Sequence, residues 1–317
     1  MTTPKAPPAA PDRPVVRVVH PCGALKGHLS ALEAGMAKLE AEGCEVRWSE
    51  SRARSDWRGY LAGDDRARSR EFENALTERD VDIIWFARGG SGGGRIAGDI
   101  LRTAQRADPR IIIGFSDATS ILNTLSDRLG WVTFHGPVVT SLTREQPRSD
   151  LSEVLAVLRG ELEELPFDPQ PRSALHYSPR ITPYTPTRGR LRGGNLTVLA
   201  SMTGTDCALT PWYDSIWFLE DVGEAPYRLD RSFWQLRSSG VLSGANGLWL
   251  GDFDAQGAEM STILKMFVED AAIEVGLGAP AGHAGTIAAL PIGGEVEIDW
   301  SRGVMSARGP WVSRDAS

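Results

Sequence analysis

Short runs of β-branched and aromatic residues alternate with longer segments of helical apolar spacing over roughly the first 140 positions. The runs predict strands, and the segments in which apolar residues recur every three or four positions predict helices. The predicted strands are 15–19, 45–48, 82–87 and 111–113, and the predicted helices are one from Leu29 that Gly43 ends, one through Phe72 and Leu76, and one at 96–107. This order favours parallel strands with right-handed crossovers, in a doubly wound α/β domain whose site lies at the carboxyl ends of the strands.

The pattern changes after about residue 150. A short helix is expected at 151–158, and the stretch 166–186, rich in proline and serine, indicates an extended linker. Beyond it, strands are expected at 215–219, 247–251 and 296–300, and helices at 233–236 and 260–275. The sequence therefore predicts an N-terminal α/β domain with a mostly parallel sheet, followed by a smaller β-rich C-terminal domain.

These patterns divide the chain into four parts. The first, 1–14, is polar and rich in proline, lacks the apolar core of a signal peptide, and is expected to be a disordered tail. The other parts are the α/β domain at 15–150, a linker at 151–190 and the β-rich domain at 191–317.

Composition narrows the possible partners. The 317 residues hold 41% hydrophobic and 24% charged side chains with a net charge of -7, values of an ordinary soluble protein. No basic block favours nucleic acid, and no apolar run approaches the roughly 20 residues of a membrane span. The three cysteines lack pairing or metal-ligand spacing, which is typical of a reducing, cytoplasmic compartment.

The turn Gly114-Phe115-Ser116-Asp117 lies between a predicted strand and a predicted helix. An elbow of this kind exposes a serine hydroxyl beside a helix N-terminus, whose free N–H groups can stabilise an oxyanion. Ser116 is therefore a candidate nucleophile. The alternative is a plain helix cap by serine or aspartate, which needs no chemistry.

A glycine run at 89–94 follows another predicted strand. Gly92, Gly94 and Ala97 fit a dinucleotide-binding pattern, but on a later strand than the first, where a single match carries little weight. Backbone N–H donors for an oxyanion near Ser116 are the better functional interpretation, and a flexible turn is the structural alternative.

A nucleophilic serine needs a base, and the base needs an acid to orient it. His20 and His135 are expected at strand ends of the first domain, whereas His283 lies in a glycine-flanked loop of the second. The acid candidate is Glu220, at the end of a predicted apolar strand. The order Ser…Glu…His is one in which triads occur.

Several segments together resemble the LD-carboxypeptidase family of serine peptidases. They follow the family's order over nearly the whole chain. The matching segments are Ala62–Ala67, Arg88–Gly90, Gly114–Thr119, His135–Pro137, Gly193–Leu196, Leu219–Asp221 with Pro226–Arg231, and Gly282–His283.

The resemblance implies a role for each of five residues. Ser116 would be the nucleophile, His283 the general base and Glu220 the acid that orients it. The backbone N–H groups of Gly90 and Asp117 would form the oxyanion hole. The resemblance also implies a site assembled between two domains, a homodimer, and no metal or organic cofactor.

Substrate contacts are harder to place. Asn195, Arg228 and Arg231 are candidates, the arginines because peptide carboxylates favour guanidinium partners. One position departs from the family: Ser91 stands where an aromatic residue is usual, which leaves the shape of the cleft open. Ala118 replaces the last glycine of a lipase-type elbow, as the family has it.

The implied activity is release of the terminal D-alanine from murein tetrapeptides during peptidoglycan recycling. Two alternatives remain. One is an immunity-type peptidase of the same family, which hydrolyses peptidyl- or aminoacyl-nucleotide conjugates. The other is a binding module that kept the fold and lost the chemistry.

Overall fold

The computed structural model describes residues 3–50, 55, 57–145, 150–169, 185–253, 262–263, 266–267, 273–283 and 285–314. Most of the predicted linker at 166–186 and of the predicted helix at 260–275 lies outside these residues. At the end of that predicted helix, Glu274–Leu277 form a strand.

The first sheet has six strands in the order β11-β5-β4-β3-β1-β2, and all pairs are parallel except β11 with β5. Its strands are β1 (Val15–Val19), β2 (Glu45–Arg47), β3 (Ile83–Phe86), β4 (Ile111–Gly114), β5 (Thr133–His135) and β11 (Leu290–Ile292). Every residue of β3, β4 and β5 is buried, which explains why β3 and β4 appear in the sequence as unbroken apolar runs.

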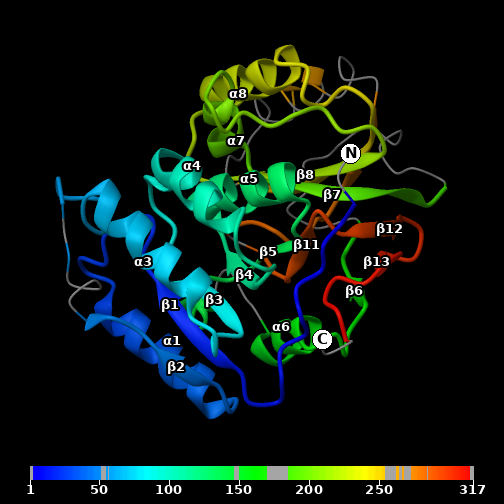
Figure 1. Ribbon diagram of the computed structural model, residues 1–317. Helices are drawn as coiled ribbons and strands as arrows, with labels where there is room; N and C mark the ends of the chain where they lie inside the picture. Colours follow the sequence, from blue (N-terminus) through cyan, green and yellow to red (C-terminus); the bar gives the residue numbers. More distant parts are fainter. Residues whose placement is uncertain are drawn as a thin grey trace.

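Helices and two short 3₁₀ turns connect these strands (Figure 1). They are α1 (Leu29–Ala41), α3 (Asp65–Thr77), α4 (Gly93–Ala104), η1 (Ser116–Ala118), α5 (Thr119–Leu129) and η2 (Val139–Ser141). Helices α3, α4 and α5 pack side by side, and α5 also contacts the second sheet.

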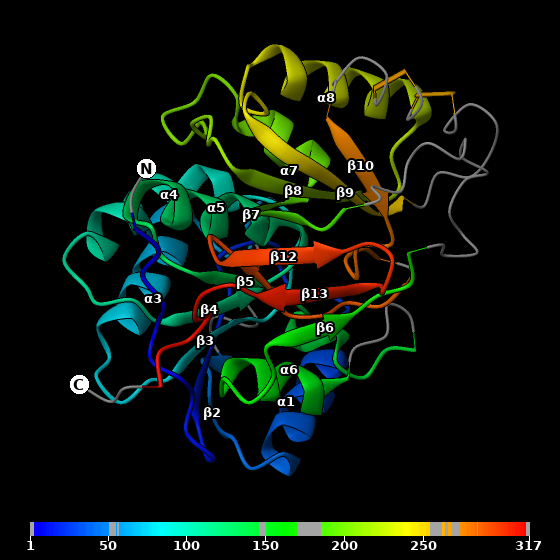
Figure 2. The same ribbon diagram turned by 90° about the vertical axis from the view of Figure 1, so that its right-hand side faces the viewer.

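The second sheet has seven strands in the order β10-β9-β8-β7-β12-β13-β6 (Figure 2). Strands β7 to β10 are parallel, and β12, β13 and β6 are antiparallel. The strands are β6 (Glu164–Pro166), β7 (Thr187–Asn195), β8 (Ser215–Asp221), β9 (Ala245–Phe253), β10 (Glu274–Leu277), β12 (Glu295–Asp299) and β13 (Val304–Ala307). The helices of this half are α6 (Leu151–Leu158), α7 (Leu196–Met202) and α8 (Pro226–Ser238). The predicted fold class, a parallel-sheet α/β domain with a β-rich C-terminal domain, is confirmed.

Several short segments cross the expected boundaries. Strand β6 comes from the predicted linker yet closes one edge of the second sheet, and β11 comes from the C-terminal part yet closes one edge of the first. The predicted tail is hydrogen-bonded: the N–H of Lys5 donates to the Gly130 carbonyl at 2.7 Å and that of Ala9 to Ser313 at 2.8 Å. Three-residue strands and single bridges carry too little periodicity to stand out in a sequence. The boundaries at 150 and 190 stay a prediction.

One face of α5 binds the end of β7 through polar side chains four residues apart. The amide of Asn123 donates to the Gly193 carbonyl at 2.8 Å, and the hydroxyl of Thr119 accepts the backbone N–H of Asn195 at 3.1 Å. One turn further, the Asp127 carboxylate meets an arginine of β7. Because α5 follows the Ser116 turn directly, these bonds fix that turn relative to the second sheet.

The arginine of β7 that meets Asp127 is Arg192, whose side chain is almost wholly buried. Its guanidinium donates to Asp127 at 2.6 Å and to the Thr210 carbonyl at 2.6 Å, and it lies 4.1 Å and 4.8 Å from the ring centroids of Trp212 and Trp217. Burial lowers the pKa of Arg192 to about 10, although the negative charge of Asp127 acts to raise it. An ion pair so placed is costly to break from one side, since the remaining charge stays buried without its partner.

Replacing Arg192 with methionine should lower the free energy of unfolding by up to about 3–5 kcal/mol. Asp127 stays buried without its main partner and keeps only the bonds from Thr210 and the longer 3.6 Å contact with Arg128. Urea unfolding measures this change. Arg188→Met is the matched control. Arg188 lies on the same strand as Arg192 and pairs with Glu297 of β12, but it is 65% exposed, so its loss should cost below about 1 kcal/mol. Equal losses in the two variants would contradict a special role for the buried pair.

Candidate active site

The turn after β4 holds Ser116 in an unusual backbone conformation. Phe115 is extended, and Ser116 then adopts a φ of 62°, a left-handed value rarely seen outside glycine. Such strain costs on the order of 1–3 kcal/mol and is typical of functional turns. The helix-cap interpretation is wrong, because Ala118 is the N-cap of α5 and no side chain caps that end.

Asp117 is tied to the glycine loop instead. Its carboxylate accepts the backbone N–H of Gly93, the first residue of α4, at 2.7 Å. Burial raises the pKa of this carboxyl, while the bonds from Gly93 and from the Cys22 thiol act in the opposite direction. Burial and the nearby Asp117 raise the pKa of the Cys22 thiol, so this cysteine is a poor nucleophile.

The glycine loop is held against the serine turn. A Cβ on Gly89 would lie 2.8 Å from the Cβ of Ser116, and Gly90 has a φ of 109° with no room for a side chain beside Gly23. The guanidinium of Arg68 donates to the Gly92 carbonyl at 2.9 Å. These contacts argue against a flexible turn and hold Gly89, the residue before the candidate oxyanion donor Gly90, against Ser116.

The candidate acid and base meet directly. Glu220 lies fully buried in β8, and its carboxylate is 2.9 Å from Nδ1 of His283, whose side chain is 21% exposed. Burial raises the pKa of Glu220, and His283 opposes the rise. With Nδ1 donating to Glu220, Nε2 keeps its lone pair and can accept a proton.

His283 also reaches the serine turn. Its ring lies 4.2 Å, centroid to centroid, from that of Phe115, the residue before Ser116. Gly282 has a φ of 141°, and a Cβ there would lie 2.4 Å from the Cβ of Asp252, so a glycine is required for the loop to present His283. The structure thus brings Glu220, His283 and the turn of Ser116 together from the two sheets.

The other histidines take different places. His20 pairs with Glu71 at 3.0 Å, and its side chain is only 1% exposed, so substrate cannot reach it. His135 is buried beside Phe115, His28 lies at the start of α1, and His176 is outside the described residues.

The substrate-binding candidates are not gathered at one point. Asn195 ends β7 and caps α7: its amide donates to Asp221 at 3.0 Å and its oxygen accepts from Val198. Arg228 and Arg231 lie on the exposed side of α8, where both flank Tyr227 and Arg228 is 3.6 Å from Glu224.

Sequence reasoning missed the side chains that hold the site in place. Phe115, Asp117 and Arg68 support the turn and the glycine loop, and nothing in their spacing marks them. Thr119, Asn123 and Asp127 recur at four-residue spacing on one face of α5, but Ser120, Thr124 and Ser126 are polar as well, so this face does not stand out in the sequence.

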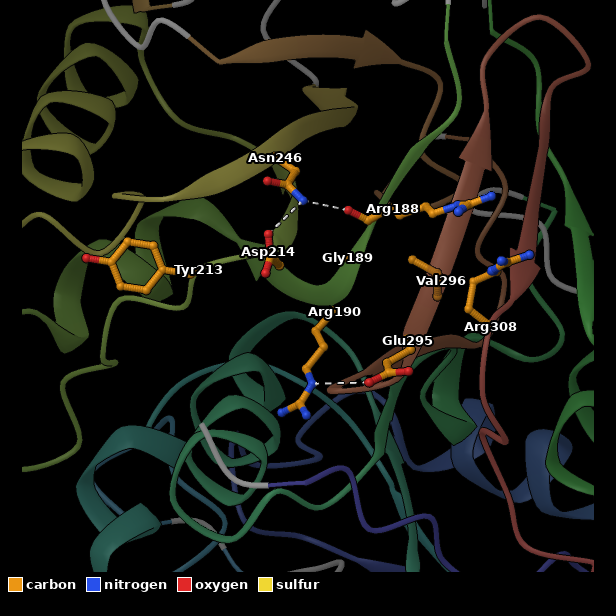
Figure 3. A pocket seen from close by; sticks show the side chains of 9 residues that line it. All are labelled: Arg188, Gly189, Arg190, Tyr213, Asp214, Asn246, Glu295, Val296 and Arg308. Atoms are coloured by element: carbon orange, nitrogen blue, oxygen red, sulfur yellow. Dashed lines mark hydrogen bonds and ion pairs between the residues drawn. The ribbon is translucent and has the colours of Figure 1, made fainter.

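A separate cavity of about 400 Å³ lies at the amino ends of β7, β8 and β9, away from Glu220 (Figure 3). It is lined by Arg188, Gly189, Arg190, Tyr213, Asp214, Asn246, Glu295, Val296 and Arg308. None of the predicted site residues lines it. The described residues hold no cluster of three or more metal-ligating side chains, and none of their helices is long and apolar enough to cross a membrane.

Comparison with known proteins identifies the family of the chain. Residues 16–136 match the LD-carboxypeptidase N-terminal domain and residues 188–298 the LD-carboxypeptidase C-terminal domain. The murein tetrapeptide carboxypeptidase of Pseudomonas aeruginosa is 34% identical over 90% of this chain and 94% of its own. The chain therefore belongs to the LD-carboxypeptidase family and is a peptidase by class.

Solved structures show the same fold. The muramoyltetrapeptide carboxypeptidase of Oxalobacter formigenes is 28% identical, with a TM-score of 0.73 over 92% of this chain and 96% of that one. The microcin C7 self-immunity protein MccF has a TM-score of 0.84 over 98% and 100% of the two chains at 20% identity, which shows a shared fold.

The lowered pKa of His135 determines how the free energy of unfolding should depend on pH. Burial, with a smaller contribution from His283, lowers its pKa from 6.5 to about 3. Between these values the unfolded chain binds a proton that the folded protein does not. The free energy of unfolding should therefore fall as pH drops below 6.5, by up to about 1.4 kcal/mol per pH unit.

Urea unfolding from pH 7 to pH 4 tests this, with His135→Phe compared against the wild type. The variant should lose this part of the acid slope. His28→Phe should lose a smaller part, because burial and two nearby arginines also lower the pKa of His28 but by less than burial lowers that of His135. A difference curve between wild type and His135→Phe that is flat with pH would contradict the prediction.

Proposed function

We propose that this protein is a serine LD-carboxypeptidase that releases the terminal D-alanine of murein tetrapeptides in peptidoglycan recycling. The observation that carries the proposal is the Glu220–His283 pair, which rests on Phe115 next to the strained Ser116. A buried carboxylate that orients an imidazole beside a serine elbow is the arrangement that acyl transfer needs.

In the proposed mechanism, Nε2 of His283 takes the proton of the Ser116 hydroxyl as its oxygen bonds to the carbonyl carbon that joins an L-centre to D-alanine. The backbone N–H groups of Gly90 and Asp117 stabilise the oxyanion. Collapse breaks the C–N bond, and His283 gives its proton to the leaving nitrogen of D-alanine. Water then enters, loses a proton to His283, and releases the acyl group from Ser116, which regains its proton.

Substrate recognition completes the proposal. Arg228 and Arg231 are exposed on α8, which begins five residues after β8 ends, so either guanidinium can serve a peptide carboxylate. The side-chain amide of Asn195 is engaged with Asp221 and α7, so we expect it to shape the end of β7 while bound substrate lies beyond it.

Murein peptide is the preferred substrate class because the murein tetrapeptide carboxypeptidase of Pseudomonas aeruginosa is 34% identical to this chain, whereas MccF of Escherichia coli is 22% identical. The immunity-type activity on nucleotide conjugates is the alternative within the same site. A cytoplasmic location and a homodimer belong to the proposal and come from the family resemblance, with support from three free, buried cysteines for a reducing compartment.

The test is D-alanine release from a murein tetrapeptide, followed by chromatography. Ser116→Ala should lower kcat by about 10³-fold or more, because no other nucleophile is placed in the turn. Ser201→Ala, an exposed serine on α7, is the matched control and should retain full activity.

Undiminished release by Ser116→Ala would overturn the mechanism. Turnover of an aminoacyl sulfamoyl-adenylate in place of the tetrapeptide would assign the immunity-type activity. Failure of a fluorophosphonate to label Ser116, with neither substrate consumed, would favour a binding module.

A further inference from the structure

His135 is a buried polar side chain that the proposed mechanism does not use. It ends β5, is 0% exposed, and neither of its ring nitrogens has a hydrogen-bond partner among the described residues. Leaving a buried polar group without a partner is costly, so a residue of this kind needs an explanation.

The aromatic rings packed against His135 explain how its imidazole is accommodated without a hydrogen-bond partner. The His135 ring packs edge-to-face between Phe115 and Phe218, with centroid distances of 5.2 Å and 4.9 Å and interplanar angles of 83° and 75°. Such contacts direct the positive edge of one ring at the negative face of another. An imidazole N–H can be accommodated in this way without a conventional acceptor.

These contacts extend to the candidate base. Phe115 lies between His135 and His283, with its ring centroid 5.2 Å from the first and 4.2 Å from the second. His283, Phe115, His135 and Phe218 thus form one continuous ring column, which crosses from the loop of His283 to β8 of the second sheet by way of β5. His135 occupies the middle of this ring column.

We propose that His135 is a positioning residue, an uncharged aromatic spacer that fixes Phe115 and through it holds the His283 imidazole over the Ser116 turn. This rests on the proposed function. The role requires that His135 carry no charge, and its complete burial together with the neighbouring His283 favours the neutral form. A proton-transfer role is disfavoured, since no polar group of the described residues lies within hydrogen-bond reach of either nitrogen.

The main test is a double-mutant cycle of His135→Ala and Phe115→Leu, read out as kcat and KM for D-alanine release. His135→Ala should lower kcat about 30- to 100-fold and change KM less than about 3-fold, because the base is displaced while substrate contacts remain. In the Phe115→Leu background the same change should lower kcat less than about 3-fold, since its effect passes through Phe115.

Chemical rescue separates a spacer from a proton carrier. The cavity left by His135→Ala is apolar and of the kind that binds small aromatic molecules. Thiophene, which cannot titrate, should restore kcat at least 5-fold. Rescue by imidazole with none by thiophene would overturn the proposal.

A third measurement does not depend on turnover. The proton on Nδ1 of His283, bonded to Glu220, should give a downfield NMR signal in the wild type that broadens or shifts in His135→Ala and returns with thiophene. An unchanged signal together with unchanged kcat would overturn the positioning role. If the wild type releases no D-alanine, the proposed function fails, and this NMR signal still decides the role of His135.

Discussion

The contact between α5 and β7 is the constraint on which the candidate site depends. The serine turn belongs to the first sheet and Glu220 to the second, so catalysis needs a fixed relation between the two. Thr119, three residues after Ser116, accepts the N–H of Asn195, and Asn195 pairs in register with Glu220 on β8. Two hydrogen-bonded steps therefore connect the nucleophile turn to the carboxylate, with the buried Arg192–Asp127 pair two helical turns further along α5.

A buried ion pair contributes little net stability, but arrangements that separate its two charges are costly. The guanidinium of Arg192 satisfies Asp127, the Thr210 carbonyl and the faces of two tryptophans, so one docking geometry satisfies every partner at once. A shift of α5 along β7 by one residue would separate Arg192 from Asp127 while both side chains stay buried. The same logic holds at Asp117, whose buried carboxylate is satisfied only when the serine turn and the glycine loop are in place together.

Local pattern in the sequence predicted the elements well, because strands such as β3 and β4 are buried on both faces and helices such as α1 have a regular apolar stripe. The triad candidates followed from motif order and resemblance, and the pairing of Glu220 with His283 agrees with that hypothesis. The sequence could not predict β6 or β11, which are three residues long and take their partners from distant parts of the chain. Nor could the sequence predict which side chains hold the site in place. Phe115, Asp117 and His135 act through contacts between segments far apart in the chain, and residue spacing does not show which segments will be in contact.

The path of the chain around His283 shows how closely the site is tied to complete folding. Before His283, the N–H of Ala279 donates to Leu250 and that of Asp252 donates to Ala281, which attaches the loop to β9 of the second sheet. After it, β11 enters the first sheet, where Leu290 pairs with His135. His283 therefore lies on a bridge between two sheets and cannot be placed by either one alone. Each end of this segment is anchored through backbone bonds in a different sheet, so the distance from His283 to Phe115 depends on how the two sheets lie against each other. The position of the base therefore depends on the docking of α5 on β7, which fixes that relation.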